Sequence, residues 1–104
     1  MVISEDIENG RDMLTAQQIV AKSPDTVSRI IGEEAVIILP GMGELKVTND
    51  VGARLWELAD GQKTVADLVD ILCEEYTVDR DQAEKDALVF LQQMVDKSML
   101  IVVK

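Results

Sequence analysis

The pattern of apolar and polar residues predicts two paired β-strands early in the chain. Val27 to Ile31 is a short apolar stretch, and Gly32-Glu33-Glu34 is a polar break suited to a hairpin turn. Ala35 to Leu39 is a continuous apolar run rich in β-branched residues, which is typical of a strand buried on both faces or nearly so. These segments predict a small antiparallel sheet.

A third strand is predicted after a second turn. Pro40 to Gly43 supplies proline and glycines where the chain must reverse. Glu44 to Thr48 then alternates polar and apolar residues with the period of a half-buried strand. On this pattern we expect Leu45 and Val47 to face the core.

From Asn49 the apolar spacing becomes helical and predicts three helices. The first begins at an N-cap, Asn49 or Asp50, and stops at Asp60-Gly61. The second begins at Thr64, with Asp67 in a capping-box-like position, and ends near Tyr76. The third begins at Asp79 or Asp81 and buries one apolar face, made of Ala83, Ala87, Leu88, Leu91, Met94 and Val95.

The chain closes with a short apolar segment, residues 99–103, which is expected to add a final strand to the sheet. The order predicts an α+β fold of the winged helix-turn-helix type: a three-stranded antiparallel sheet, three helices and a short C-terminal strand. Residues 1–22 are expected to form a flexible acidic segment, although 14–22 could also pack on the domain. Residues 23–104 are expected to form the winged helix domain.

Composition narrows the possible functions. The chain has 104 residues, a formal charge of −10, no histidine and one cysteine. Such an acidic chain is not expected to bind nucleic acid or an anionic membrane. Without histidine, paired cysteines or a phosphate loop, we expect neither catalysis nor a bound metal or cofactor. Cys73 lies on an apolar helix stripe and is interpreted as a buried, inert thiol, and the chain is expected to be cytoplasmic.

A winged helix shape raises the alternative of a DNA-binding transcription factor. Its recognition helix would be the third, where residues 79–97 carry five acidic and three basic side chains. That charge balance is wrong for contact with phosphates. An acyl carrier protein is also disfavoured, because none of Ser4, Ser23, Ser28 and Ser98 follows an aspartate.

An interaction site is predicted between the third strand and the third helix. If Glu44–Thr48 is a sheet edge, its unpaired backbone groups could accept an extended peptide as one more strand. The same edge could instead pair two copies of the chain. On a helical wheel Phe90 falls at the border of core and solvent, where it is either core periphery or the floor of a shallow groove. Lys46 could oppose edge aggregation or pair with an acidic peptide residue.

The segment from Leu45 to Gly61, LKVTNDVGARLWELADG, resembles the PqqD family. That family shows a strand leading into L-N-x-x-(A/G)-x-x-(I/L)-W-x-L-x-D-G. The likeness continues through Thr64-Val65-Ala66-Asp67-Leu68 and Tyr76 into a long last helix that contains Phe90-Leu91. It covers about residues 24–102.

The resemblance implies a recognition element for ribosomally synthesised and post-translationally modified peptides (RiPPs). Such a domain binds the leader of a precursor peptide by strand addition and presents it to a modifying enzyme, often a radical SAM maturase. The chain itself would be non-catalytic and a monomer or weak homodimer. Four residues match the family signature but are interpreted as structural: Trp56, Leu58, Asp60 and Gly61. The peptide-binding residues implied by position are Gly43, Glu44, Leu45, Lys46 and Val47 on the strand, and Asp86, Val89, Phe90 and Gln93 on the helix.

Overall fold

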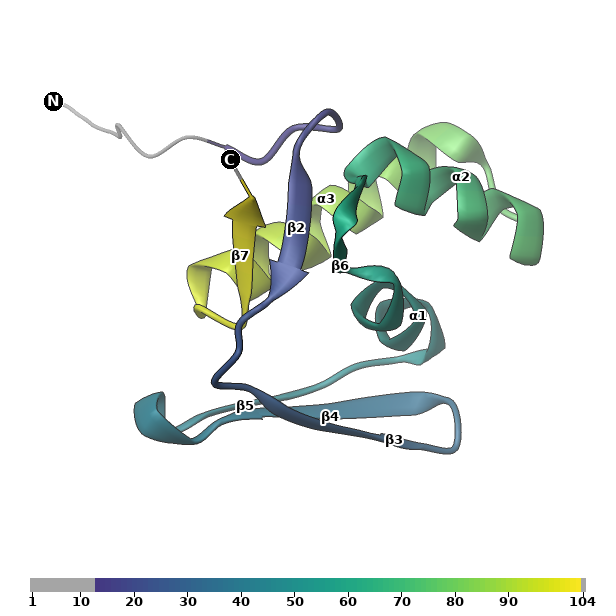
Figure 1. Cartoon of the computed structure of the whole chain (residues 1–104). Helices are drawn as coiled ribbons and strands as arrows, with labels where there is room; N and C mark the ends of the chain where they lie inside the picture. Colours follow the sequence, from purple (N-terminus) through teal and green to yellow (C-terminus); the bar gives the residue numbers. More distant parts are fainter. Residues whose placement is uncertain (1–12, 104) are drawn as a thin grey trace, which may run out of the picture.

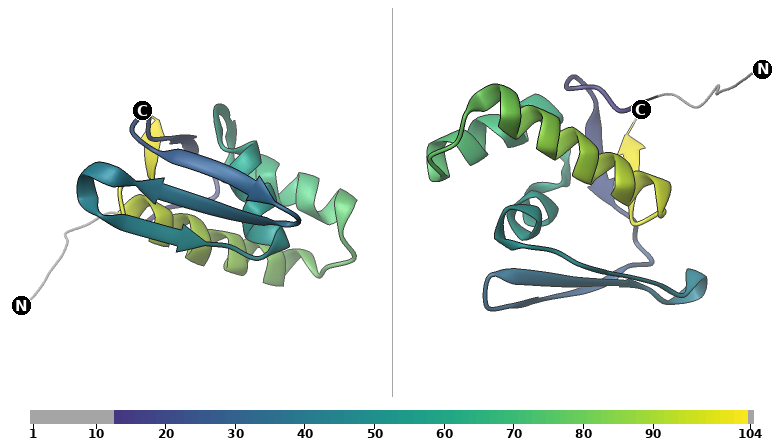
Figure 2. Two further views of the ribbon diagram at one scale, coloured as in Figure 1. Left: turned by 90° about the horizontal axis from the view of Figure 1, so that it is seen from below. Right: turned by 180° about the vertical axis from the view of Figure 1, so that it is seen from behind.

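The structure, a computed structural model, describes residues 13–103 and is an α+β arrangement of two antiparallel sheets and three helices (Figure 1). The helix α1 lies between the two sheets, and α3 extends along one side of the molecule (Figures 1 and 2). The elements in order are β2 (Ile19–Lys22), β3 (Val27–Ile31), β4 (Glu34–Leu39), the 3-10 turn η1 (Pro40–Met42), β5 (Glu44–Val47), α1 (Asp50–Leu58), β6 (Asp60–Thr64), α2 (Val65–Glu75), α3 (Arg80–Asp96) and β7 (Leu100–Val103).

The first sheet confirms the three predicted strands and has the order β3-β4-β5. Its inner face is set by β4, where Ala35, Ile37 and Leu39 are buried. Lys46 of β5 pairs with Ile37 and therefore points to the same side.

The expectation that Leu45 and Val47 face the core is wrong. Leu45 pairs with Ile38, and Val47 with Val36, on the outer face of the sheet. The two side chains are 58% and 51% exposed. Alternation along a strand correctly shows that two residues share a face, but the pairing with β4 decides which face that is.

A second sheet, with the order β6-β2-β7, contains two strands that the sequence did not predict. The C-terminal strand β7 pairs with β2, with Ile19 opposite Val103, and not with the first sheet as expected. Of the two alternatives for residues 14–22, a flexible segment or one packed on the domain, the structure confirms the second, because β2 is paired on both sides and Val20 is completely buried. Residues 1–12 of the expected flexible segment lie outside the described residues.

The helix starts follow the predicted caps. Asn49 accepts a hydrogen bond from the backbone of Gly52 at 2.8 Å, and Asp79 accepts one from the backbone of Gln82 at 3.1 Å. Thr64 and Asp67 form a complete capping box at the start of α2. Each cap satisfies backbone N–H groups that the first helical turn would otherwise leave without a partner.

The core lies where the three helices meet both sheets. Trp56 of α1 is 2% exposed, and its Nε1 donates a hydrogen bond to Ser28 Oγ at 3.1 Å. That bond ties α1 to β3 on the inner face of the first sheet, in agreement with the structural role expected of Trp56. Cys73 is only half-buried at the edge of the core, so the expectation of a buried thiol is met in part.

Candidate functional site

The edge of β5 offers backbone hydrogen-bonding groups. Within residues 13–103, β5 pairs with β4 on one side and with no strand on the other. The backbone N–H of Thr48 donates to the carbonyl oxygen of Ala35 at 3.0 Å. Because hydrogen-bonding direction alternates along an antiparallel strand, Lys46 also bonds toward β4, whereas Leu45 and Val47 direct their N–H and C=O groups to the open edge. A strand added at this edge would therefore pair with the backbone, and not the side chains, of these two residues.

The helix α3 runs along the β5 side of the first sheet, with its C-terminal end near the start of β5 (Figure 2). An ion pair joins the two elements, because Lys97 Nζ lies 3.3 Å from Glu44 Oε1. Both side chains are about 40% exposed, so we expect this pair to add little to stability. The ion pair does show that the end of α3 lies against the start of β5.

At the other end of β5 the surface is hollowed beside Phe90. This hollow, of about 260 Å³, lies between α1 and α3 and is called the Phe90 hollow below. It is lined by Asn49, Val51, Gly52, Leu55, Asp86, Ala87 and Phe90.

Gly52 allows α1 and α3 to approach each other at the Phe90 hollow. A Cβ atom at Gly52 would lie 3.0 Å from the Cβ of Thr48 and 3.1 Å from Cε1 of Phe90. Phe90 is itself half-buried against the core, as predicted for a residue at the border of core and solvent. The position therefore needs glycine for space and not for an unusual backbone conformation.

The structure divides the predicted site residues of α3 into two groups. Asp86 and Phe90 line the Phe90 hollow, one helical turn apart. Val89, which is 59% exposed, and Gln93 lie on the outward side of α3. Gly43 has a φ of +66° and ends the η1 turn, and it positions the start of β5.

Sequence reasoning missed the contribution of α1 to this site. None of the predicted binding residues lies on the first helix, whereas Val51, Gly52 and Leu55 of α1 line the Phe90 hollow. A usable signal was present in Gly52, because glycine in the first turns of a helix is costly and often marks a close approach.

The charges of α3 do not favour a polyanion. Arg80 forms an ion pair with Asp70 of α2, and this contact raises the pKa of the Arg80 guanidinium. Lys97 is paired with Glu44. Two of the three basic side chains counted on this helix are therefore engaged with carboxylates.

Two further observations concern residues 13–103. They contain no group of three or more histidine, cysteine, aspartate or glutamate side chains placed to hold a metal ion. None of the helices in this range is both long and apolar enough to cross a lipid bilayer.

Fold and site together define an α+β domain with an open strand edge beside a hollowed helix surface. Comparison with known proteins gives the family: residues 34–100 match the family described as coenzyme PQQ synthesis protein D, PqqD. The chain belongs to the PqqD family.

Curated relatives match over a shorter region. The chain is 35% identical over 52 residues to the PqqA binding protein of Rhodopseudomonas palustris strain HaA2, and 33% identical to that of strain TIE-1. Each match covers 50% of this chain and 51% of the relative, so the chain spans about half the length of these relatives.

Solved structures match over most of the chain. TbiB1, determined in complex with the TbiA(beta) leader peptide, is 34% identical, with a TM-score of 0.68 over 77% of this chain and 93% of that one. The PqqD part of Methylobacterium extorquens PqqCD, described as a stand-alone RiPP recognition element, is 21% identical, with a TM-score of 0.71 over 85% of this chain and 94% of that one. At that lower identity the second likeness supports the fold.

Proposed function

We propose that this protein is a non-catalytic RiPP recognition element. It binds the leader segment of a ribosomally made precursor peptide and presents it to a modifying enzyme, for which a radical SAM maturase is our leading candidate. The observation that carries the proposal is the open edge of β5 beside the Phe90 hollow. It agrees with the leader peptide complex of the 34% identical protein TbiB1.

The leader would add to β5 as a further strand. The outward N–H and C=O groups of Leu45 and Val47 would supply the hydrogen bonds of strand addition. The leader's side chains facing α3 would contact Phe90 and the polar residues beside it. The proposed binding residues remain Gly43 to Val47 of the strand and Asp86, Val89, Phe90 and Gln93 of the helix.

The arrangement of three helices beside the sheet β3-β4-β5 supports a winged helix-turn-helix description, and this shape keeps DNA binding as a second hypothesis. The acidic balance of α3 and the ion pairs of Arg80 and Lys97 argue against it. Anisotropy measurements with random duplex DNA at low salt separate the two hypotheses, because a peptide-binding domain leaves the DNA signal unchanged.

The direct test uses short peptides encoded next to the gene of this protein. Each is labelled with a fluorophore and titrated with the full chain. We expect one of them to bind with a dissociation constant of about 1 µM or below, equivalent to roughly −8 kcal/mol. The proposal fails if every such peptide binds more weakly than about 1 mM. Sedimentation at several concentrations tests the competing use of the β5 edge in a homodimer.

A further inference from the structure

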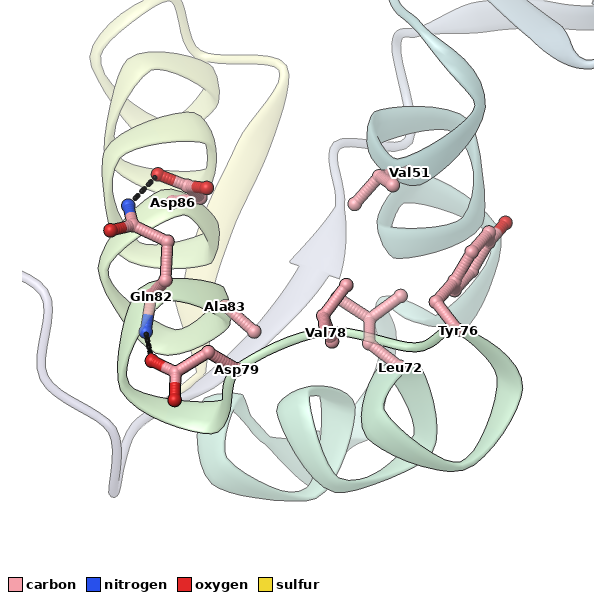
Figure 3. Close-up of a pocket in the computed structure, with 8 residues that line it drawn as sticks. All are labelled: Val51, Leu72, Tyr76, Val78, Asp79, Gln82, Ala83 and Asp86. Atoms are coloured by element: carbon pink, nitrogen blue, oxygen red, sulfur yellow. Dashed lines mark hydrogen bonds between the residues drawn. The ribbon is translucent and has the colours of Figure 1, made fainter.

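A second cavity continues the proposed site along α3. This cavity, called the α3 cavity below, has a volume of about 220 Å³ and lies between the starts of α1 and α3 and the end of α2 (Figure 3). Its walls include the apolar side chains of Val51, Leu72, Val78 and Ala83. A cavity of about 150 Å³ accommodates benzene, so this one has room for a large aliphatic or aromatic side chain.

The α3 cavity adjoins the Phe90 hollow. The two share Val51 of α1 and Asp86 of α3, which Figure 3 shows on opposite sides of the opening. From Phe90 to Ala83 the helix advances by roughly 10 Å, at about 1.5 Å per residue. An extended peptide covers that distance in about three residues. A peptide bound at Phe90 can therefore reach the α3 cavity without a turn.

The opening of the α3 cavity is acidic. Asp79 and Asp86 line it together with Gln82, and none of the lysine and arginine side chains within residues 13–103 does. Asp86 Oδ1 accepts a hydrogen bond from Gln82 Nε2 at 2.9 Å, and Asp79 Oδ2 accepts one from the Gln82 backbone at 3.1 Å. Both donors are neutral, so these bonds do not cancel the negative charge. An apolar interior with an acidic rim fits an apolar side chain with a cationic neighbour.

We infer that the α3 cavity is a specificity pocket for the bound peptide. It takes one large apolar side chain, and Asp79 and Asp86 select a lysine or arginine next to it. Since β5 runs toward α1, a peptide added antiparallel to it brings its N-terminal part to the cavity. The selected residues therefore precede the segment that pairs with β5. This inference rests on the proposed strand addition and names the peptides that the site would select.

The probe is a 15-residue random peptide library displayed on phage and selected on the full chain. The strongest enriched peptide is synthesised with a fluorophore in three forms. One is intact, one has its large apolar residue changed to serine, and one lacks the residues before the pairing segment. We expect the enriched set to share a large apolar residue next to lysine or arginine.

Two variants alter the cavity wall. Val78→Asp places a charge at an exposed wall position, and Ala83→Leu fills the space from the helix. With either variant we expect the dissociation constant of the intact peptide to rise at least tenfold. The truncated peptide should bind both variants as it binds the wild type. On the wild type, the peptide with serine in place of its apolar residue should show the same loss of affinity. On Val78→Asp, that peptide should bind no more weakly than the intact peptide does. Circular dichroism checks that the variants are folded. If Ala83→Leu is not folded, the result with Val78→Asp decides the test.

A matched pair of variants tests the charge. Gln82→Lys adds a positive charge at the opening, and Gln62→Lys makes the same substitution at an exposed position of β6. We expect the first to weaken binding of the intact peptide at least threefold and the second to leave it unchanged. Equal effects of the two would overturn the charge selection.

The outcomes separate this inference from the proposed function. If the intact peptide binds Val78→Asp as tightly as the wild type but loses affinity for Leu45→Pro, the cavity inference is wrong and strand addition stands. If no peptide is enriched, or if the enriched peptides bind Leu45→Pro as tightly as the wild type, the proposed function is wrong. The cavity inference, which rests on it, is then wrong as well.

Discussion

Replacing Leu45 by proline tests strand addition at the level of a single hydrogen bond. The N–H of Leu45 points to the open edge of β5, so proline removes a donor that β4 does not use. Proline is tolerated on edge strands at such positions. We therefore expect Leu45→Pro to change the free energy of unfolding by less than about 1 kcal/mol.

The expected effect on peptide binding is larger. One lost backbone hydrogen bond costs about 0.5–1.5 kcal/mol, and the proline ring also obstructs the incoming strand. Together these predict a loss of about 1–3 kcal/mol, which corresponds to roughly a 5- to 150-fold rise in the dissociation constant. The measurement is anisotropy with a labelled peptide that binds the wild type.

Two neighbouring variants complete the design. Leu45→Ala removes the side chain but keeps the N–H, and since that side chain is 58% exposed we expect little change in stability. Lys46→Pro removes an N–H directed to β4, so it should lower the free energy of unfolding measured in urea. The reasoning is refuted if folded Leu45→Pro binds the peptide as tightly as Leu45→Ala does.

Three further predictions concern the scaffold. Thr64→Ala should lower the free energy of unfolding by about 1 kcal/mol in urea titrations, because it removes the capping-box oxygen that accepts from Asp67. Gly52→Ala should lower the melting temperature despite the higher helix propensity of alanine, because its Cβ would meet Thr48 Cβ at 3.0 Å. Contact with Lys63 lowers the pKa of Asp60 to about 2. The carboxylate therefore stabilises the fold above its unfolded pKa of about 3.9, and this contribution is lost as the pH falls toward 2. Asp60→Asn should accordingly show a shallower loss of stability between pH 4 and 2 in denaturation experiments.

The helix starts could be predicted from the sequence, because each is determined by residues close together in the chain. The caps at Asn49, Thr64 and Asp79 could be identified because each bonds to a backbone N–H three residues later. The strand β6 could not, because its sequence DGQKT has no apolar alternation. It is extended because it pairs with β2, a contact across about forty residues that no local pattern encodes.

Only part of the candidate site was predictable from the sequence, because only part of it is determined by local sequence patterns. The edge strand and Phe90 could be placed from periodicity and from the family resemblance. The Phe90 hollow and the α3 cavity depend on how α1, α2 and α3 pack, and only Gly52 hinted at that packing.

The distribution of charge along the site bears on the direction of the bound peptide. Lys46 lies on the inner side of β5, and Asp79 and Asp86 lie at the α3 cavity beyond the end of that strand. The Glu44–Lys97 ion pair at the far end of β5 is neutral as a pair. A peptide with basic residues first and acidic residues later would match this order only when it runs antiparallel to β5. Backbone pairing and charge then favour the same direction of the bound peptide. Asp79 and Asp86 contribute to the net charge of −10, and their position could also set the register of the peptide on β5.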